Sequence, residues 1–112
     1  GLVLRRTLAW PAPPGGAGGW IDGWIEARFE PARHELLLRT SDGLAPVLGA
    51  LMQRVRQAFD LDADPARVDP VLARLPLPAR PGHRLPGAFD GFETAVRVIL
   101  GQQVTVKAAL TL

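Results

Sequence analysis

Cysteine and long apolar runs are both absent from this chain of 112 residues. Without cysteine the chain can form no disulfide, no thiolate nucleophile and no zinc-finger ligand set. Its apolar runs extend over a few residues only, whereas a helix that crosses a bilayer needs about 20. No charged segment followed by an apolar stretch opens the chain. We therefore expect no secretory signal, no membrane partner and a cytoplasmic location.

An excess of charge of one sign is also lacking. The 13 basic residues are offset by 11 acidic ones, so the net charge is only +2, although the isoelectric point is about 10.4. Lys107 is the single lysine, and arginine, with its very high pKa, accounts for the rest of the basic residues. No run of five like charges marks a basic arm. Basicity alone is therefore weak evidence for a nucleic-acid partner.

Alternating apolar residues in the first forty positions predict three strands. Residues 2–10 and 20–29 alternate with period two, and residues 35–40 return after a turn at 30–33. The segment between the first two strands, PAPPGGAGG, is a Pro/Gly loop. The second and third strands are expected to form an antiparallel hairpin.

Two tryptophans stand out in the second predicted strand. Trp20 and Trp24 fall on its charged face, opposite the apolar positions. They could stack on nucleic-acid bases, but large aromatic side chains are usually buried. We therefore expect a helix to cover them in the complete domain.

The periodicity changes to that of a helix after residue 43. Residues 44–59 follow the i, i+3, i+4 rule, with Pro46 tolerated in the first helical turn. An Asp-Pro pair at 64–65 predicts a second helix start. A further pair at 69–70 predicts a break and a new start that runs to Leu75, because a proline inside a helix costs about 3 kcal/mol.

A linker and a third helix follow. Residues 76–87 are rich in proline, and Asp90 with Glu93 three residues later forms a predicted capping box. The order of strands and then helices predicts an α+β domain over 1–75, the linker, and the start of a helical unit over 88–112. Apolar residues at the beginning and the lack of a stop signal at the end suggest a chain truncated at both ends.

Residues 84–109, RLPGAFDGFETAVRVILGQQVTVKAA, closely resemble the opening of the catalytic domain in AlkA-type bacterial 3-methyladenine DNA glycosylases, members of the helix-hairpin-helix superfamily. The shared features are LPG, the FE pair after a capping Asp, and ILGQQV followed by VKAA. The upstream hairpin, the helix ending AFDL and the Asp-Pro pair at 64–65 match more loosely. The resemblance implies an antiparallel sheet with helices on one face, similar to the TATA-box-binding protein.

The same resemblance implies a DNA site. The segment Gly101-Gln102-Gln103 would enter the minor groove of double-stranded DNA, and Gln103 would fill the gap left by a flipped damaged base. Gly101 would permit a tight turn through a positive φ. The alternative is an ordinary helix end. Lys107 would contact a phosphate, or would be a solvated helix lysine.

No catalytic residue is expected within the chain. Asp90 is better explained as a helix cap with Glu93, and the resemblance implies a catalytic Asp beyond residue 112. His34 and His83 lie in predicted loops without metal-ligand spacing. The family resemblance implies excision of alkylated purines by a monomer that needs no metal or redox cofactor. The alternatives are a module of an alkylation-response (Ada-like) regulator fused to a glycosylase domain, and an α+β interaction domain without a DNA role.

Overall fold

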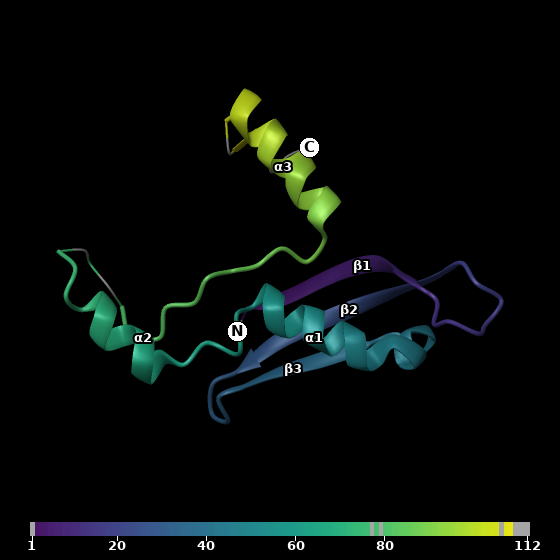
Figure 1. Ribbon diagram of the computed structural model, residues 1–112, viewed down its shortest axis with the longest axis horizontal. Coiled ribbons are helices and arrows are strands. Elements are labelled where there is room, and N and C mark those ends of the chain that lie inside the picture. The colour runs from purple at the N-terminus through teal and green to yellow at the C-terminus, as the bar shows by residue number, and fades with distance from the viewer. Residues whose placement is uncertain (1, 77, 79, 106, 109–112) are drawn as a thin grey trace. The chain divides into compact units, whose positions relative to one another are not determined.

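The computed structural model describes the chain except residues 1, 77, 79, 106 and 109–112 (Figure 1). Its elements are the strands β1 (Val3–Pro11), β2 (Trp20–Glu30) and β3 (Glu35–Thr40), the 3-10 helix η1 (Asp42–Val47), and the helices α1 (Leu48–Ala58), α2 (Pro65–Leu72) and α3 (Gly91–Gln103). The chain divides into two compact units, Gly1–Leu51 and Met52–Leu112.

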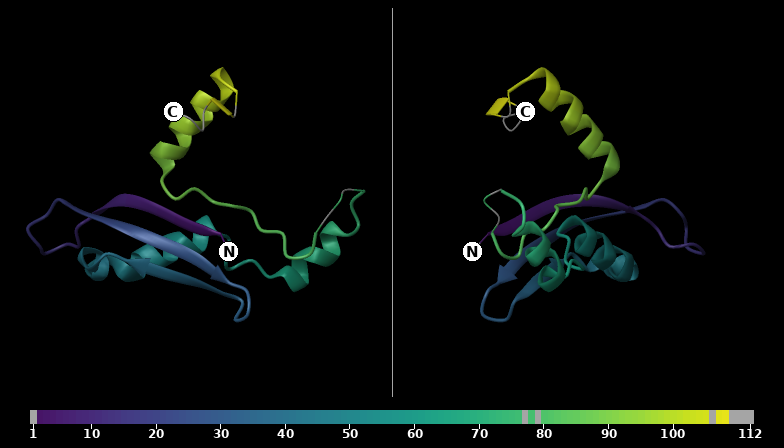
Figure 2. Two further views of the ribbon diagram at one scale, coloured as in Figure 1. Left: turned by 180° about the vertical axis from the view of Figure 1, so that it is seen from behind. Right: turned by 60° about the vertical axis from the view of Figure 1, so that its left-hand side comes forward.

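The first unit is built on an antiparallel sheet in the order β1-β2-β3 (Figure 2). In the register, Arg5 of β1 lies opposite Glu26 of β2, which lies opposite Arg39 of β3. The predicted strands and hairpin are confirmed. Their alternating pattern produces this result because side chains of a strand point to its two faces in turn, so one face becomes apolar.

That apolar face carries the core of the first unit. Ile25 and Ala27 of β2 are buried together with Leu44, Val47 and Leu51, which come from η1 and the first turn of α1. A 3-10 helix has three residues per turn, so Leu44 and Val47 lie on the same side of it. The α+β class with helical segments on one face of the sheet is confirmed.

Gly23 allows η1 to approach the sheet. A Cβ atom at this position would lie 2.5 Å from Ser41 Oγ and 2.7 Å from Leu44 Cγ, well inside van der Waals contact. Ser41 also closes the strand end, since Trp24 N donates to Ser41 Oγ at 3.1 Å and Ser41 N donates to Trp24 O at 3.1 Å. The glycine is therefore required by packing.

The first predicted helix begins differently from expectation. Residues 42–47 form a 3-10 turn around Pro46, and the α-helix starts at Leu48. Proline has no N–H to donate, and 3-10 turns are frequent at helix starts. Of the predicted apolar stripe, Leu48 and Met52 remain about half exposed, whereas Val55 is buried.

The predicted break at residues 69–70 is wrong, because α2 runs through Pro70 without interruption. Asp64 caps this helix, and its side chain accepts from Ala66 N at 3.0 Å. Pro70 removes a single intrahelical hydrogen bond from a short exposed helix, which the helix tolerates here. Beyond Leu72, single turns continue to Leu75, whose N–H donates to Leu72 O at 3.0 Å.

Among the described residues, no helix combines the length and apolar character that crossing a bilayer requires.

Candidate nucleic-acid interface

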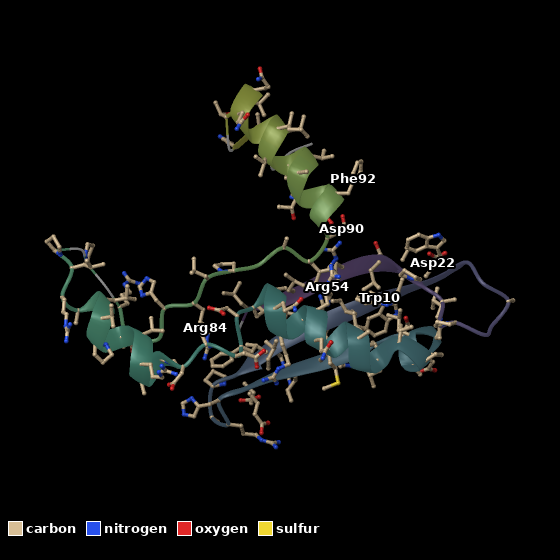
Figure 3. The ribbon with its side chains drawn as sticks, viewed as in Figure 1. Trp10, Asp22, Arg54, Arg84, Asp90 and Phe92 are labelled. Carbon is tan, nitrogen blue, oxygen red and sulfur yellow. The ribbon has the colours of Figure 1, made fainter. Side chains whose placement is uncertain are left out.

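The second unit presents the candidate site on α3, whose start is well defined. Asp90 Oδ1 accepts from Glu93 N at 2.7 Å, and Thr94 Oγ1 donates to Asp90 O at 2.7 Å (Figure 3). Asp90 is thus confirmed as the N-cap. The carboxylate of Glu93 accepts from Arg97 Nε at 2.9 Å, an i,i+4 pair along the exposed surface. Asp90 is therefore engaged in holding the helix, as expected of a structural residue.

The surface of α3 is unusually apolar for an exposed helix. None of its residues is buried. Large apolar side chains such as Phe92, 81% exposed, and Ile99, 61% exposed, stand on it. The Asp90 cap holds the start of α3, and the described residues bury none of its apolar side chains.

The predicted turn Gly101-Gln102-Gln103 forms the last turn of α3, and all three residues are exposed. Val104 ends the helix in an extended conformation, with φ −133° and ψ 160°, while its N–H donates to Leu100 O at 3.0 Å. Gly101 does not use the tolerance of glycine for a positive φ, since its backbone is helical. A Cβ atom there would meet nothing within 4 Å. Gly101 therefore leaves bare backbone on an open surface.

A second helical segment starts directly after this helix end. Thr105 Oγ1 accepts from Ala108 N at 3.3 Å, and Lys107 and Ala108 are helical and exposed. Lys107 carries a full positive charge here, which favours an anion such as phosphate. Val106 and Ala109, which belong to the VKAA part of the motif, lie outside the described residues.

The predicted DNA residues therefore lie on the two sides of the end of α3. Gln103 stands at the end of α3, and Lys107 stands in the first turn that follows Val104 and Thr105. Chemically, this part of the chain offers an exposed amide side chain, that of Gln103, and an exposed cation, that of Lys107.

The described part of the chain contains no cluster of three or more His, Cys, Asp or Glu side chains that could hold a metal ion. His34 lies in the β2–β3 turn with φ 53°. His83 lies in the segment before α3, where its Nδ1 is 2.5 Å from Arg80 O. Both histidines are in loops, as predicted from the sequence.

The open face of the sheet carries the tryptophans. Trp20 is 69% exposed and Trp24 is 43% exposed, on the face opposite η1. Within the described residues of the first unit, the helical segments cover the other face, so the expected cover of these side chains is not present there. Arg5, Thr7 and Trp24 line a shallow hollow on this face.

An ion-pair triad crosses the same face. Glu26 accepts from Arg5 Nε at 2.7 Å and from Arg39 Nη1 at 3.4 Å. The hydrogen bond from Arg5 is the main reason why the pKa of Glu26 is lowered, and the charge of Arg39 acts in the same direction. Because Glu26 is paired with both arginines, this face has no large excess of positive charge along the triad.

Two side chains that the sequence analysis left without a role contact the segment before α3. Arg54 donates to Phe89 O, and Asp60 accepts from Leu85 N. An Asp placed just after a helix end, where glycine is usual, is the sequence signal that could have indicated Asp60.

A comparison with known protein families decides the relationship of the chain. The sequence profile of the AlkA N-terminal domain matches residues 3–90. The chain belongs to the AlkA N-terminal domain family. This match covers the sheet, η1, α1 and α2, and it ends at the residue that caps α3.

Curated relatives extend the comparison. The chain is 44% identical over 96 residues to "DNA-3-methyladenine glycosylase 2" of Escherichia coli strain K12, covering 86% of this chain and 34% of that protein. It is 36% identical over 115 aligned positions to the "Probable bifunctional transcriptional activator/DNA repair enzyme AlkA" of Mycobacterium tuberculosis, covering 97% of this chain and 21% of that protein. The chain thus spans about a third or less of the length of the curated relatives it matches.

Proposed function

We propose that this chain is the N-terminal part of a cytoplasmic DNA-repair glycosylase that excises alkylated purines from double-stranded DNA. The observation that carries the proposal is the 44% identity to a protein named DNA-3-methyladenine glycosylase 2 over most of the chain. The chain contributes folding and DNA contact, and bond cleavage is assigned to residues outside it. The enzyme acts as a monomer and needs no metal or redox cofactor. The domain limits of 1–75 and 88–112, with a linker over 76–87, remain part of this proposal.

The proposed contact is made by the end of α3. Extruding a nucleotide costs a few kcal/mol of base stacking, and a side chain that fills the vacated space lowers this cost. Gln103 is exposed at the helix end and can both fill space and hydrogen-bond to the orphaned base. Gly101 adds no side chain that would keep the minor groove away. Lys107 is exposed and supplies a positive charge that can bind a backbone phosphate.

The test is the variant Gln103→Ala in the complete gene product. We expect its affinity for duplex DNA with an abasic-site analogue to fall about tenfold, or ~1.4 kcal/mol. The excision rate of 3-methyladenine should fall as well. Gln53→Ala is the matched control, because Gln53 is an exposed glutamine on α1. Equal affinity and excision rate for both variants and the parent protein would refute the role of Gln103.

A second candidate function is supported by the Mycobacterium tuberculosis relative, whose name joins a transcriptional activator to a repair enzyme. In that case the chain would belong to an alkylation-response regulator fused to a glycosylase domain. The coding sequence before residue 1 distinguishes the two. A helix-turn-helix domain with cysteine-rich segments there would favour the regulator.

A further inference from the structure

The proline-rich segment that precedes α3 is attached to the rest of the second unit at short intervals. Gly82 N donates to the two carboxylate oxygens of Asp69 at 3.1 and 3.0 Å, and Leu85 N donates to Asp60 Oδ2 at 2.9 Å. Gly87 N donates to Ala58 O at 3.0 Å, and Phe89 O accepts from Arg54 Nη1 at 2.8 Å. Figure 3 labels Arg84 in this segment, Asp90 at the start of α3 and Arg54 of α1. A flexible tether would leave these backbone groups to water.

The end of α1 is shaped to receive this segment. Asp60 has φ 52°, Asp60 N donates to Gln57 O at 3.2 Å, and Leu61 N donates to Arg56 O at 2.9 Å. These bonds form a Schellman motif, in which the left-handed position is usually glycine. An aspartate at this position is strained, but its carboxylate accepts the amide of Leu85. The choice of residue is thus explained by the contact.

Arg84 reinforces the same helix end. Its Nη1 donates to Asp60 O at 2.6 Å and to Ala63 O at 3.4 Å. Both carbonyls lie in the turn after α1, where a cation favours the negative end of the helix dipole, and Gly87 N satisfies the carbonyl of Ala58, the last residue of α1. The segment therefore contributes to the capping of α1 as well as being held by it.

Gly87 shows how closely the two backbones approach. A Cβ atom there would lie 2.6 Å from Gln57 O and 3.3 Å from the carbonyl carbon of Gln57. Its φ is not positive, so the backbone conformation itself would accept alanine. The glycine is required only because the backbone of α1 leaves no room for a side chain.

We propose that residues 82–89 form a fixed strap that determines where α3 begins, with Asp60, Gly87 and Arg54 as its attachment points. The last attachment, at Phe89 O, immediately precedes Asp90, the cap of α3. A helix of 13 residues is about 20 Å long, so a displaced start also displaces Gly101–Gln103 at the other end. The strap itself does not depend on the proposed function. An effect of the strap on DNA binding rests on the proposed function.

The test is limited trypsin digestion of the 112-residue chain, with cleavage sites followed by mass spectrometry. Trypsin does not cut Arg80–Pro81, so Arg84–Leu85 is the bond that reports on the strap. Gly87→Ala is expected to raise the rate of cleavage at Arg84 about tenfold, because the bonds of Gly87 and Leu85 open together. Gly91→Ala is the matched control, since a Cβ atom at Gly91 meets nothing within 4 Å. Its rate should stay within about twofold of the parent rate.

Cleavage at Arg56–Gln57 within α1 serves as an internal reference. Two results would refute the strap: an unchanged rate of cleavage after Arg84 in Gly87→Ala, or cleavage there in the folded parent chain as fast as in the chain unfolded by urea. If the cleavage rates after Arg56 and Arg84 both rise in Gly87→Ala, α1 itself has opened. The variant Asp60→Gly then tests the strap. Glycine accepts the left-handed conformation and removes only the carboxylate that holds Leu85. We expect a selective rise at Arg84 of about threefold or more in this variant, and its absence overturns the proposal.

Discussion

The two units of this chain are stabilised in different ways. In the first unit, apolar side chains of β2, η1 and the start of α1 are buried against one another. In the second unit, α2 and α3 have no buried residue, and backbone amides that donate to the carboxylates of Asp60, Asp69 and Asp90 hold the chain. Burying an apolar side chain contributes about 1.5–3 kcal/mol, whereas a hydrogen bond contributes about 1 kcal/mol net. Truncation of an apolar side chain should therefore cost far more in the core of the first unit than on α2 or α3.

The largest expected difference is between Leu44→Ala and Ile99→Ala. Leu44 is fully buried in the first unit, so its truncation should lower the free energy of unfolding by about 2–5 kcal/mol. Ile99 is 61% exposed on α3, and its truncation should change the free energy of unfolding by less than about 0.5 kcal/mol. Urea unfolding measured by circular dichroism and tryptophan fluorescence would show this difference. Similar losses for the two variants would contradict the comparison.

Glycines provide a second contrast, within the first unit. Gly23→Ala should destabilise the unit by about 1–3 kcal/mol, because the new Cβ atom would overlap Leu44 and Ser41. Gly49→Ala, in the first turn of α1 with nothing within 4 Å, should instead stabilise the helix by about 0.5–1 kcal/mol. All three tryptophans lie in this unit, so their fluorescence during urea unfolding reports on it. A stabilising Gly23→Ala would mean that the sheet and η1 are less closely packed than described.

A helix cap is the third comparison. Asp90→Ala should cost α3 about 1 kcal/mol, since the amide of Glu93 loses its acceptor. Asp90→Asn should retain most of the stability, because asparagine caps as well as aspartate. Amide hydrogen exchange at Glu93 and Thr94 is the measurement. Protection that persists in Asp90→Ala would show that tertiary contacts hold the helix start.

The smallest expected effect is electrostatic. The pKa of Glu26 is lowered below 4.5 chiefly by the hydrogen bond from Arg5. A lowered pKa in the folded state means that the pair stabilises the fold at pH values above 4.5, and that this contribution is lost as pH falls through the folded pKa. Carbon-detected NMR titration of the Glu26 carboxyl should give a pKa below 4.5 in the parent chain and a higher one in Arg5→Met. The same pKa in both would exclude Arg5 as the main cause.

Repeating local patterns made much of the fold predictable. The period of two in residues 20–29 indicates a strand with one apolar face, and the structure buries Ile25 and Ala27 on that face. Asp90 predicts a helix start because its side chain satisfies an amide within the same turn. The break predicted at Pro70 failed because an average proline penalty was applied to a short exposed helix, which loses only one bond there.

The candidate site was predictable only as a stretch of sequence. The resemblance indicated Gly101-Gln102-Gln103 and Lys107, and the structure adds that a helix end and a new helical start lie on the two sides of Val104. Gly101 is helical and a Cβ atom there would have open space, so neither its conformation nor its packing in the described residues requires glycine.

The sequence by itself determined the elements whose causes lie within one or two turns of the chain: the alternating strands and the Asp caps. Only the tertiary structure decided the roles of Gly23, Asp60 and Gly87. Each of these residues is explained by a contact with a residue far away in the sequence. The contacts are with Leu44 for Gly23, with Leu85 for Asp60 and with Gln57 for Gly87. Local propensity contains no information about such partners, because close backbone approach and long-range hydrogen bonds arise only when the chain has folded.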